Sequence, residues 1–280
     1  TLSSGAHAPN SLFVDSAGSL TIPAGTLILA AASQIDGSFA LTGGVLDGPG
    51  TVTVTGTGSW TAGTMQGTGV TRLGAGGSLT IGDNGNNKYL LARKFENAGT
   101  VTWATTTYAI FLGDGAVIEN QAGGLFDAQT DSSLSSYSGA APRFDNLGTF
   151  HKSAGTGTTS VGVAFNNIGG TVDVQSGTVS LTAGSASSGG TFTIGAGSVL
   201  GYDGGTHTLS GAYSVSGAGE LRASAGSVAF DSGGTANVVH LRVSGGTLVL
   251  QVLGAMTPTE VRLTSGMLSV AGSMTVSGVF

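Results

Sequence analysis

Hydrophobic and polar residues alternate along most of the chain, in short runs that begin with glycine. The unit has the pattern Gly-x-Φ-x-Φ, where x is usually Ser or Thr and Φ is apolar. Examples are GSLTI at 18–22 and 77–81, GTVTW at 99–103, GTVDV at 170–174 and GTFTI at 190–194. Alternation with a period of two predicts a short β-strand that buries one face and presents the other to water. The leading glycine favours a tight corner, because glycine accepts the positive φ that a β-carbon disfavours.

A longer motif sets the repeat length. Copies with the pattern Phe-x-Asn-Φ-Gly start at Phe95, Phe144 and Phe165, and a divergent copy starts at Ile118, so that successive starts lie 23, 26 and 21 residues apart. This interval suits one coil of a three-sided parallel β-helix. It is too short for a propeller blade, and a β-sandwich would not repeat a motif in this way. We therefore predict an all-β fold, a right-handed parallel β-helix (β-solenoid) with about 20–26 residues per coil. Roughly twelve such coils, stacked about 4.8 Å apart, would give a single elongated rod over residues 1–280.

The repeated asparagine of the longer motif is the first group of candidate site residues. Asparagine at a corner tolerates left-handed backbone geometry and can hydrogen-bond to its counterpart in the next coil. We expect Asn97, Asn120, Asn146 and Asn167 to form a structural ladder along one corner of the rod.

The regular pattern is interrupted twice and ends abruptly. Residues 83–94 and 128–143 are predicted to form loops or irregular coils, and the cluster of Lys88, Arg93 and Lys94 is expected to be solvated. The chain begins with Thr and ends within a repeat, which suggests a fragment of a longer or processed protein.

The end of a solenoid exposes unpaired strand edges unless it is capped. We therefore expect head-to-tail self-association, with Met274, Val276, Val279 and Phe280 as candidates for end-to-end contact.

Composition narrows the choice of partners. The chain has 51 glycines, 9% charged residues, no cysteine and a net charge of −6 with only nine lysines and arginines. So few cations argue against a nucleic-acid partner, and no apolar run is long enough to predict insertion in a membrane. The absence of cysteine excludes a disulfide framework and cysteine-ligated metal.

The residues that carry chemistry are sparse. His7, His151, His207 and His240 lack the spacing of metal ligands, and no glycine pair opens a phosphate-binding helix, so we expect no metal and no cofactor. Cleavage of a polysaccharide needs two carboxylates held close together. Glu119 and Asp145 are the acids that can stack on neighbouring coils, but repetition at equivalent corners favours a structural role, and we predict no enzymatic activity.

Two binding functions stay open as alternatives. Flat rows of Thr-x-Thr can order water, and TVTVT at 51–55 and TFT at 191–193 fit an ice-binding solenoid locally, although the rows are not regular. Trp and Tyr side chains can stack on sugar rings, but the ones in this chain are spread thinly and are interpreted as core or corner residues. They are Trp60, Trp103, Tyr89, Tyr108, Tyr202 and Tyr213.

A resemblance adds an expectation of function. WTAGTMQG at 60–67, the Phe-x-Asn copies, GTHTL at 205–209 and GAGEL at 217–221 resemble the repeat regions of large bacterial exported β-helix proteins, of the autotransporter-passenger and filamentous-haemagglutinin type. The similarity runs from about residue 41 onward. It implies an extracellular structural or adhesive solenoid on the bacterial cell surface, part of a fibre or filament, with a host or matrix glycan as a candidate ligand. The alternatives are a polysaccharide-binding or polysaccharide-cleaving β-helix and an ice-binding solenoid.

Overall fold

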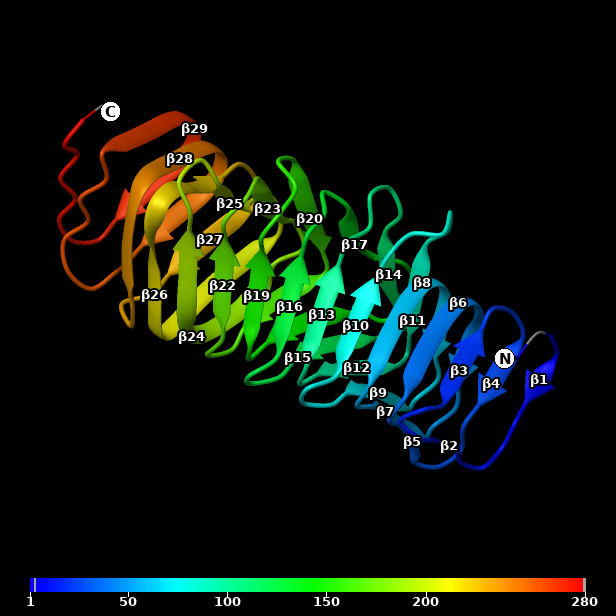
Figure 1. Cartoon of the computed structure of the whole chain (residues 1–280). Coiled ribbons are helices and arrows are strands. Elements are labelled where there is room, and N and C mark those ends of the chain that lie inside the picture. The colour runs from blue at the N-terminus through cyan, green and yellow to red at the C-terminus, as the bar shows by residue number, and fades with distance from the viewer. Residues whose placement is uncertain (3, 279–280) are drawn as a thin grey trace.

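The computed structural model describes residues 1–2 and 4–278, and the regular structure of these residues is all β-strand. The strands are parallel and stack as a β-solenoid of about 13 turns, with about 21 residues per turn. Figure 1 shows the resulting rod, with β1 (Ala6–His7) near one end and β29 (Glu260–Val270) at the other. The parallel solenoid predicted from the repeat is confirmed.

Each turn contributes to three ladders of parallel strands, which we call faces 1, 2 and 3 in the order in which the chain visits them. Face 1 contains β3 (Ser19–Ile22), β10 (Ser78–Ile81), β13 (Thr100–Trp103), β16 (Leu125–Ala128), β19 (Thr149–Lys152) and β22 (Thr171–Val174). Face 2 contains β1, β4 (Thr26–Ile28), β11 (Lys88–Leu91), β14 (Ile110–Gly113), β17 (Ser133–Ser136), β20 (Thr158–Gly162), β23 (Thr178–Leu181) and β25 (Val199–Tyr202).

Face 3 contains β2 (Phe13–Val14), β5 (Ser33–Ile35), β7 (Thr51–Val54), β9 (Val70–Leu73), β12 (Lys94–Asn97), β15 (Val117–Asn120), β18 (Arg143–Asn146), β21 (Ala164–Asn167) and β27 (Ser227–Phe230). Longer strands turn a corner and serve more than one face. They are β6 (Ser38–Asp47), β8 (Thr57–Gln66), β24 (Ser185–Ile194), β26 (Thr206–Ala223), β28 (Thr235–Leu250) and β29.

The alternating pattern places one apolar column of each face inside the rod. On face 1 the register neighbours Leu79, Val101 and Phe126 are each at most 4% exposed. Phenylalanines from faces 1 and 3 meet in the interior with ring centroids 5.1–5.9 Å apart. Because full burial of one such side chain stabilises by about 1.5–3 kcal/mol, this column is the main source of stability.

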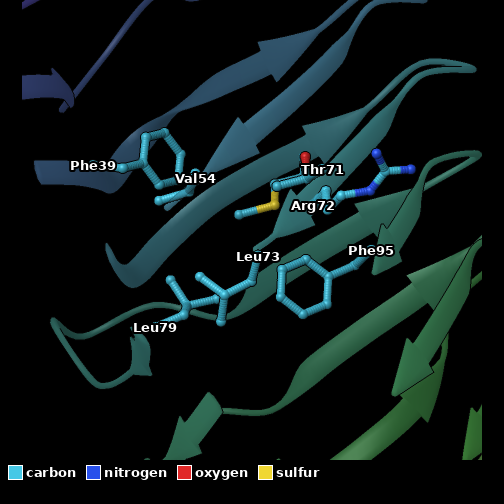
Figure 2. A pocket seen from close by; sticks show the side chains of 8 residues that line it. Phe39, Val54, Thr71, Arg72, Leu73, Leu79 and Phe95 are labelled. Atoms are coloured by element: carbon cyan, nitrogen blue, oxygen red, sulfur yellow. The ribbon is translucent and has the colours of Figure 1, made fainter. Parts of the chain in front are cut away.

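The interior has little free space. The cavity in Figure 2 has a volume of about 10 Å³ and is lined mainly by apolar side chains, among them Phe39, Leu79 and Phe95. This is about the space that one water molecule needs. A ligand would therefore have to bind on the outside of the rod.

The leading glycines of the short units serve two purposes. Gly177 and Gly190 have φ values of +58° and +84°, as expected for tight corners. Gly99 does not have a positive φ, but a β-carbon there would collide with the carbonyl oxygen of Gly77 in the preceding turn. Close stacking of the backbones thus requires glycine even where the corner itself does not.

The two predicted interruptions are shorter than expected. Residues 83–94 contain β11, and residues 128–143 contain β17, so each range returns to the rod after a short loop. The reason is burial, since Leu90 is 0% and Leu134 is 1% exposed and both belong to the core. Neither strand has the Gly-x-Φ-x-Φ pattern, so the sequence pattern does not predict them.

Candidate functional site

The four repeated asparagines lie one above another at the ends of β12, β15, β18 and β21, and each is 0% exposed. Asn97 Nδ2 donates to Asn120 Oδ1 at 2.7 Å, Asn120 to Asn146 at 2.8 Å, and Asn146 to Asn167 at 2.8 Å. The second hydrogen of each of these three Nδ2 groups goes to a backbone carbonyl oxygen of the next turn, at 2.9 Å. In the turn after Asn167, the Ser187 hydroxyl accepts from the Asn167 N–H. The ladder is buried and joins four consecutive turns of the rod.

Of the predicted end-to-end contact residues, the structure describes Met274 and Val276. Met274 and Val276 are partly buried and pack against the core, and Met274 forms a parallel bridge with Met256. Val279 and Phe280 lie outside the described residues. Met274 and Val276 thus extend the core into the final turn.

The predicted solvation of the basic cluster is wrong for two of its members. Lys88 is 0% and Arg93 is 1% exposed, and Lys88 Nζ lies 3.0 Å from Asp83 Oδ1. The Arg93 guanidinium donates at 2.8–3.2 Å to Thr71 Oγ1 and to the carbonyl oxygens of Gly48, Gly50, Gln66 and Val70. Burial lowers the pKa of Arg93 to about 10, against the opposing effect of the Asp47 charge. The cation thus joins backbone carbonyl groups of two successive turns at a corner of the rod.

The Asp83 carboxylate accepts hydrogen bonds from Thr106 and Lys88. Burial raises its pKa, but these hydrogen bonds and the Lys88 charge outweigh that effect and bring the pKa to about 2. Within residues 1–2 and 4–278 no group of three His, Cys, Asp or Glu side chains is arranged to hold a metal ion.

The two acids considered for polysaccharide cleavage are register neighbours on face 3. Glu119 lies opposite Asp145, and each carboxylate is engaged by a cation. Lys94 Nζ lies 2.9 Å from Glu119 Oε2, and Arg143 Nε lies 2.7 Å from Asp145 Oδ2. Each of the two carboxylates is thus neutralised by a cation, and together they form part of a column of ion pairs on the outer side of face 3.

The outer side of face 1 carries an incomplete hydroxyl array. One column runs through Thr149, Thr171 and Thr191, but the column two residues further along each strand contains His151 and Asp173. Paired Thr-x-Thr rows therefore do not repeat over these turns.

Face 2 brings together three aromatic rings that the sequence leaves far apart. Tyr89 of β11 is in register with Phe111 of β14, and their rings stack at 5.5 Å with an angle of 16° between the planes. Tyr137, which follows β17, meets them edge-on, with centroids 5.3 Å from Tyr89 and 5.9 Å from Phe111. Tyr137 is 57% exposed. We call these three residues the aromatic surface.

The sequence pattern does not predict the aromatic surface, because its three rings are spread over about 50 residues of the chain. Phe111 follows Tyr89 by 22 residues and Tyr137 follows Phe111 by 26, intervals close to one coil length. Comparing the aromatic spacing with the repeat length would have revealed the cluster.

A polar depression adjoins the aromatic surface. It has a volume of about 300 Å³ and shares Tyr89 with Thr64, Asn86 and Asn87, while Gly43, Ala62 and Gly63 complete its lining. Amide and hydroxyl groups donate and accept hydrogen bonds at once, as sugar hydroxyls do. Aromatic faces beside such groups are suited to an amphipathic ligand.

Comparison with protein-family models, with curated proteins and with solved structures found no match. In the part of the chain that the structure describes, no helix is long and apolar enough to cross a membrane.

Proposed function

We propose that this chain is an extracellular structural and adhesive β-solenoid that binds polysaccharide through the aromatic surface. The observation that carries the proposal is the clustering of Tyr89, Phe111 and Tyr137 on the outer side of face 2. Aromatic residues make up only 6% of the chain, and three of them meet outside the core. Tyr137 is exposed, and Tyr89 and Phe111 are half-buried on the outer side of the sheet, where they do not belong to the core. Apolar patches on the surface typically mark binding sites.

The geometry of the cluster favours a chain of sugars. A sugar ring has an apolar face that packs on an aromatic ring, and its hydroxyl groups need hydrogen-bond partners. Tyr137 supplies the exposed ring, and Thr64, Asn86 and Asn87 supply polar groups beside Tyr89. Successive coils are about 4.8 Å apart, similar to the length of one sugar unit, so a polysaccharide lying along the rod meets neighbouring coils with neighbouring sugars.

The extracellular and adhesive parts of the proposal rest on the resemblance to repeat regions of exported bacterial surface proteins, and the solenoid fold is compatible with it. We do not favour cleavage of the polysaccharide, because Glu119 and Asp145 are each paired with a cation. Ice binding is disfavoured by the mixed second column of face 1, where His151 and Asp173 interrupt the hydroxyl pattern.

Affinity electrophoresis tests the proposal, with neutral and acidic polysaccharides embedded in native gels. We expect at least one polysaccharide to retard the chain, and Tyr137→Ala to lose most of the retardation. The matched control is Phe13→Ala, which removes an aromatic side chain that is 67% exposed elsewhere on the rod. Free migration of the parent chain in every gel, or equal retardation of Tyr137→Ala and the parent, would contradict the proposal.

End-to-end association stays a prediction of its own. Leu263 and Met267 of β29 are 46% and 51% exposed, and a further solenoid turn stacked on β29 would cover them. That turn would come from a second copy under the head-to-tail hypothesis. If so, sedimentation should show concentration-dependent assembly that Met267→Lys abolishes, and a parent chain that stays monomeric at every concentration would refute it.

A further inference from the structure

Three of the nine cationic side chains form one column on face 2, near the C-terminal end of the rod. Arg222 of β26 is the register partner of Arg242 in β28, which is the partner of Arg262 in β29. In the preceding turns the same column contains Gly201 and Ser180. Small residues thus suffice for the fold at this position, and the three arginines replace them in consecutive turns.

The other six cations have partners that explain them. Lys88, Arg93 and Lys152 are buried and hydrogen-bonded inside the rod. On face 3 the ion pairs join Arg72, Lys94 and Arg143 to Glu96, Glu119 and Asp145.

The arginine column is only partly neutralised. Arg222 makes two hydrogen bonds to Asp203, at 3.0 and 2.6 Å, and Arg262 Nε lies 3.7 Å from Glu260 Oε1. Arg242, between them, has no hydrogen bond and no ion pair with any described residue, and its Nε is buried without a partner.

This arrangement is unfavourable in the free protein. Like charges directly opposite each other on neighbouring strands destabilise a sheet, and guanidinium groups stay charged at every ordinary pH. A local feature that opposes stability, and that the fold compensates only in part, is expected at functional sites. An anion bound to Arg242 would supply the missing partner and screen the three charges from one another.

We propose that Arg222, Arg242 and Arg262 bind the acid groups of an acidic polysaccharide, which deepens and rests on the proposed polysaccharide binding. The planar guanidinium donates in pairs to carboxylate or sulfate oxygens. Because the turns are about 4.8 Å apart, a chain with one acid group per sugar matches one arginine per turn.

The neighbouring groups restrict where such a chain can lie. Glu220, His240 and Glu260 form the adjacent column, two residues earlier in each strand, and His240 Nδ1 lies 3.2 Å from Glu260 Oε2. A depression of about 280 Å³ opens beside Glu220 and His240. The carboxylates repel acid groups and accept hydrogen bonds from sugar hydroxyls, so they orient the chain with its acid groups toward the arginines.

The aromatic surface lies on the same face. Five strand-to-strand steps, from β14 through β17, β20, β23 and β25 to β26, separate Phe111 from Arg222. This is roughly 24 Å at the usual strand spacing. One polysaccharide of modest length can therefore contact both. The net charge of −6 opposes a polyanion at long range, so the binding must depend on these local contacts and weaken with added salt.

The test compares binding of the parent chain and its variants to polygalacturonate, dextran sulfate and neutral dextran, by titration calorimetry at low and at moderate salt. We expect Arg242→Gln to bind polygalacturonate about tenfold more weakly, the effect of losing one charge-assisted contact. Arg242→Lys keeps the charge but loses the paired donors of the guanidinium, so its affinity should lie between those of the parent and Arg242→Gln. This variant also keeps the test valid if Arg242→Gln does not fold. Arg143→Gln, at a 49% exposed side chain on face 3, is the control and should bind like the parent.

Each outcome is decisive. If Arg242→Gln weakens binding to dextran sulfate about tenfold and the parent does not bind polygalacturonate, the site is supported and is assigned to sulfated chains. If Tyr137→Ala loses binding and Arg242→Gln does not, the polysaccharide function stands and the arginine site is refuted. An equal loss in Arg143→Gln also refutes the site, because general charge then explains the effect. Absence of binding to any polysaccharide, including those in the native gels, overturns both proposals.

Discussion

The asparagine ladder gives the sharpest test of how the rod is held together. Asn120 has a buried neighbour on each side and makes three hydrogen bonds with its amide group. Its Nδ2 donates to Asn146 Oδ1 and to the Thr149 carbonyl oxygen, and its Oδ1 accepts from Asn97 Nδ2. Asn120→Ala removes all three.

The expected cost follows from these contacts. A net contribution of about 1 kcal/mol for each hydrogen bond gives about 3 kcal/mol, and a buried polar group left without a partner adds about 1–3 kcal/mol. Asn146 Oδ1 is such a group, because its hydrogen bond comes from Asn120. We expect the free energy of unfolding to fall by about 4–6 kcal/mol.

Urea denaturation followed by tryptophan fluorescence measures the change. Trp60 and Trp103 are 1% and 0% exposed, and Trp103 belongs to β13, which directly follows the first ladder residue along the chain. Asn237→Ala, at an exposed asparagine outside the ladder, is the control. A loss below about 1 kcal/mol, or a loss equal to that of the control, would refute the reasoning, since it would mean that the ladder bonds are no better than bonds to water.

Three further predictions concern other features of the rod. Burial lowers the pKa of His207 below its ordinary value of 6.5, so the unfolded chain binds the proton more readily, and the free energy of unfolding should fall as the pH drops below about 6.5. His207→Gln should reduce this dependence in denaturation series from pH 7 to 5, and an unchanged slope would count against it. Gly226 and Gly197 both have positive φ, but only at Gly226 would a β-carbon collide with the neighbouring turn. Gly226→Ala should therefore destabilise the rod far more than Gly197→Ala, and equal melting temperatures of the two variants would contradict this. Arg93→Met should lower the urea midpoint sharply, because it removes five hydrogen bonds, whereas a midpoint like the parent's would show that the cation is dispensable.

The fold class and the stacking of the four asparagines follow from the amino-acid sequence alone. The asparagine motif recurs in four consecutive turns at one corner, so its copies stack on one another, and the hydrogen bonds from Asn97 to Asn167 follow that order. The alternating units likewise identify the buried column, because a strand has a period of two.

Which other residues become neighbours depends on the folded rod. The turns differ in length, with 19 residues between the register partners Ser38 and Thr57 and 25 between Thr100 and Leu125. The register between turns is therefore set by packing of the core and stacking of the corner glycines, and a fixed period along the chain does not predict it. Burial of Arg93 depends in the same way on carbonyl groups from turns about 20 to 45 residues away. The aromatic surface and the arginine column arise from this register, since a solenoid brings together residues whose separation equals the local length of its turn.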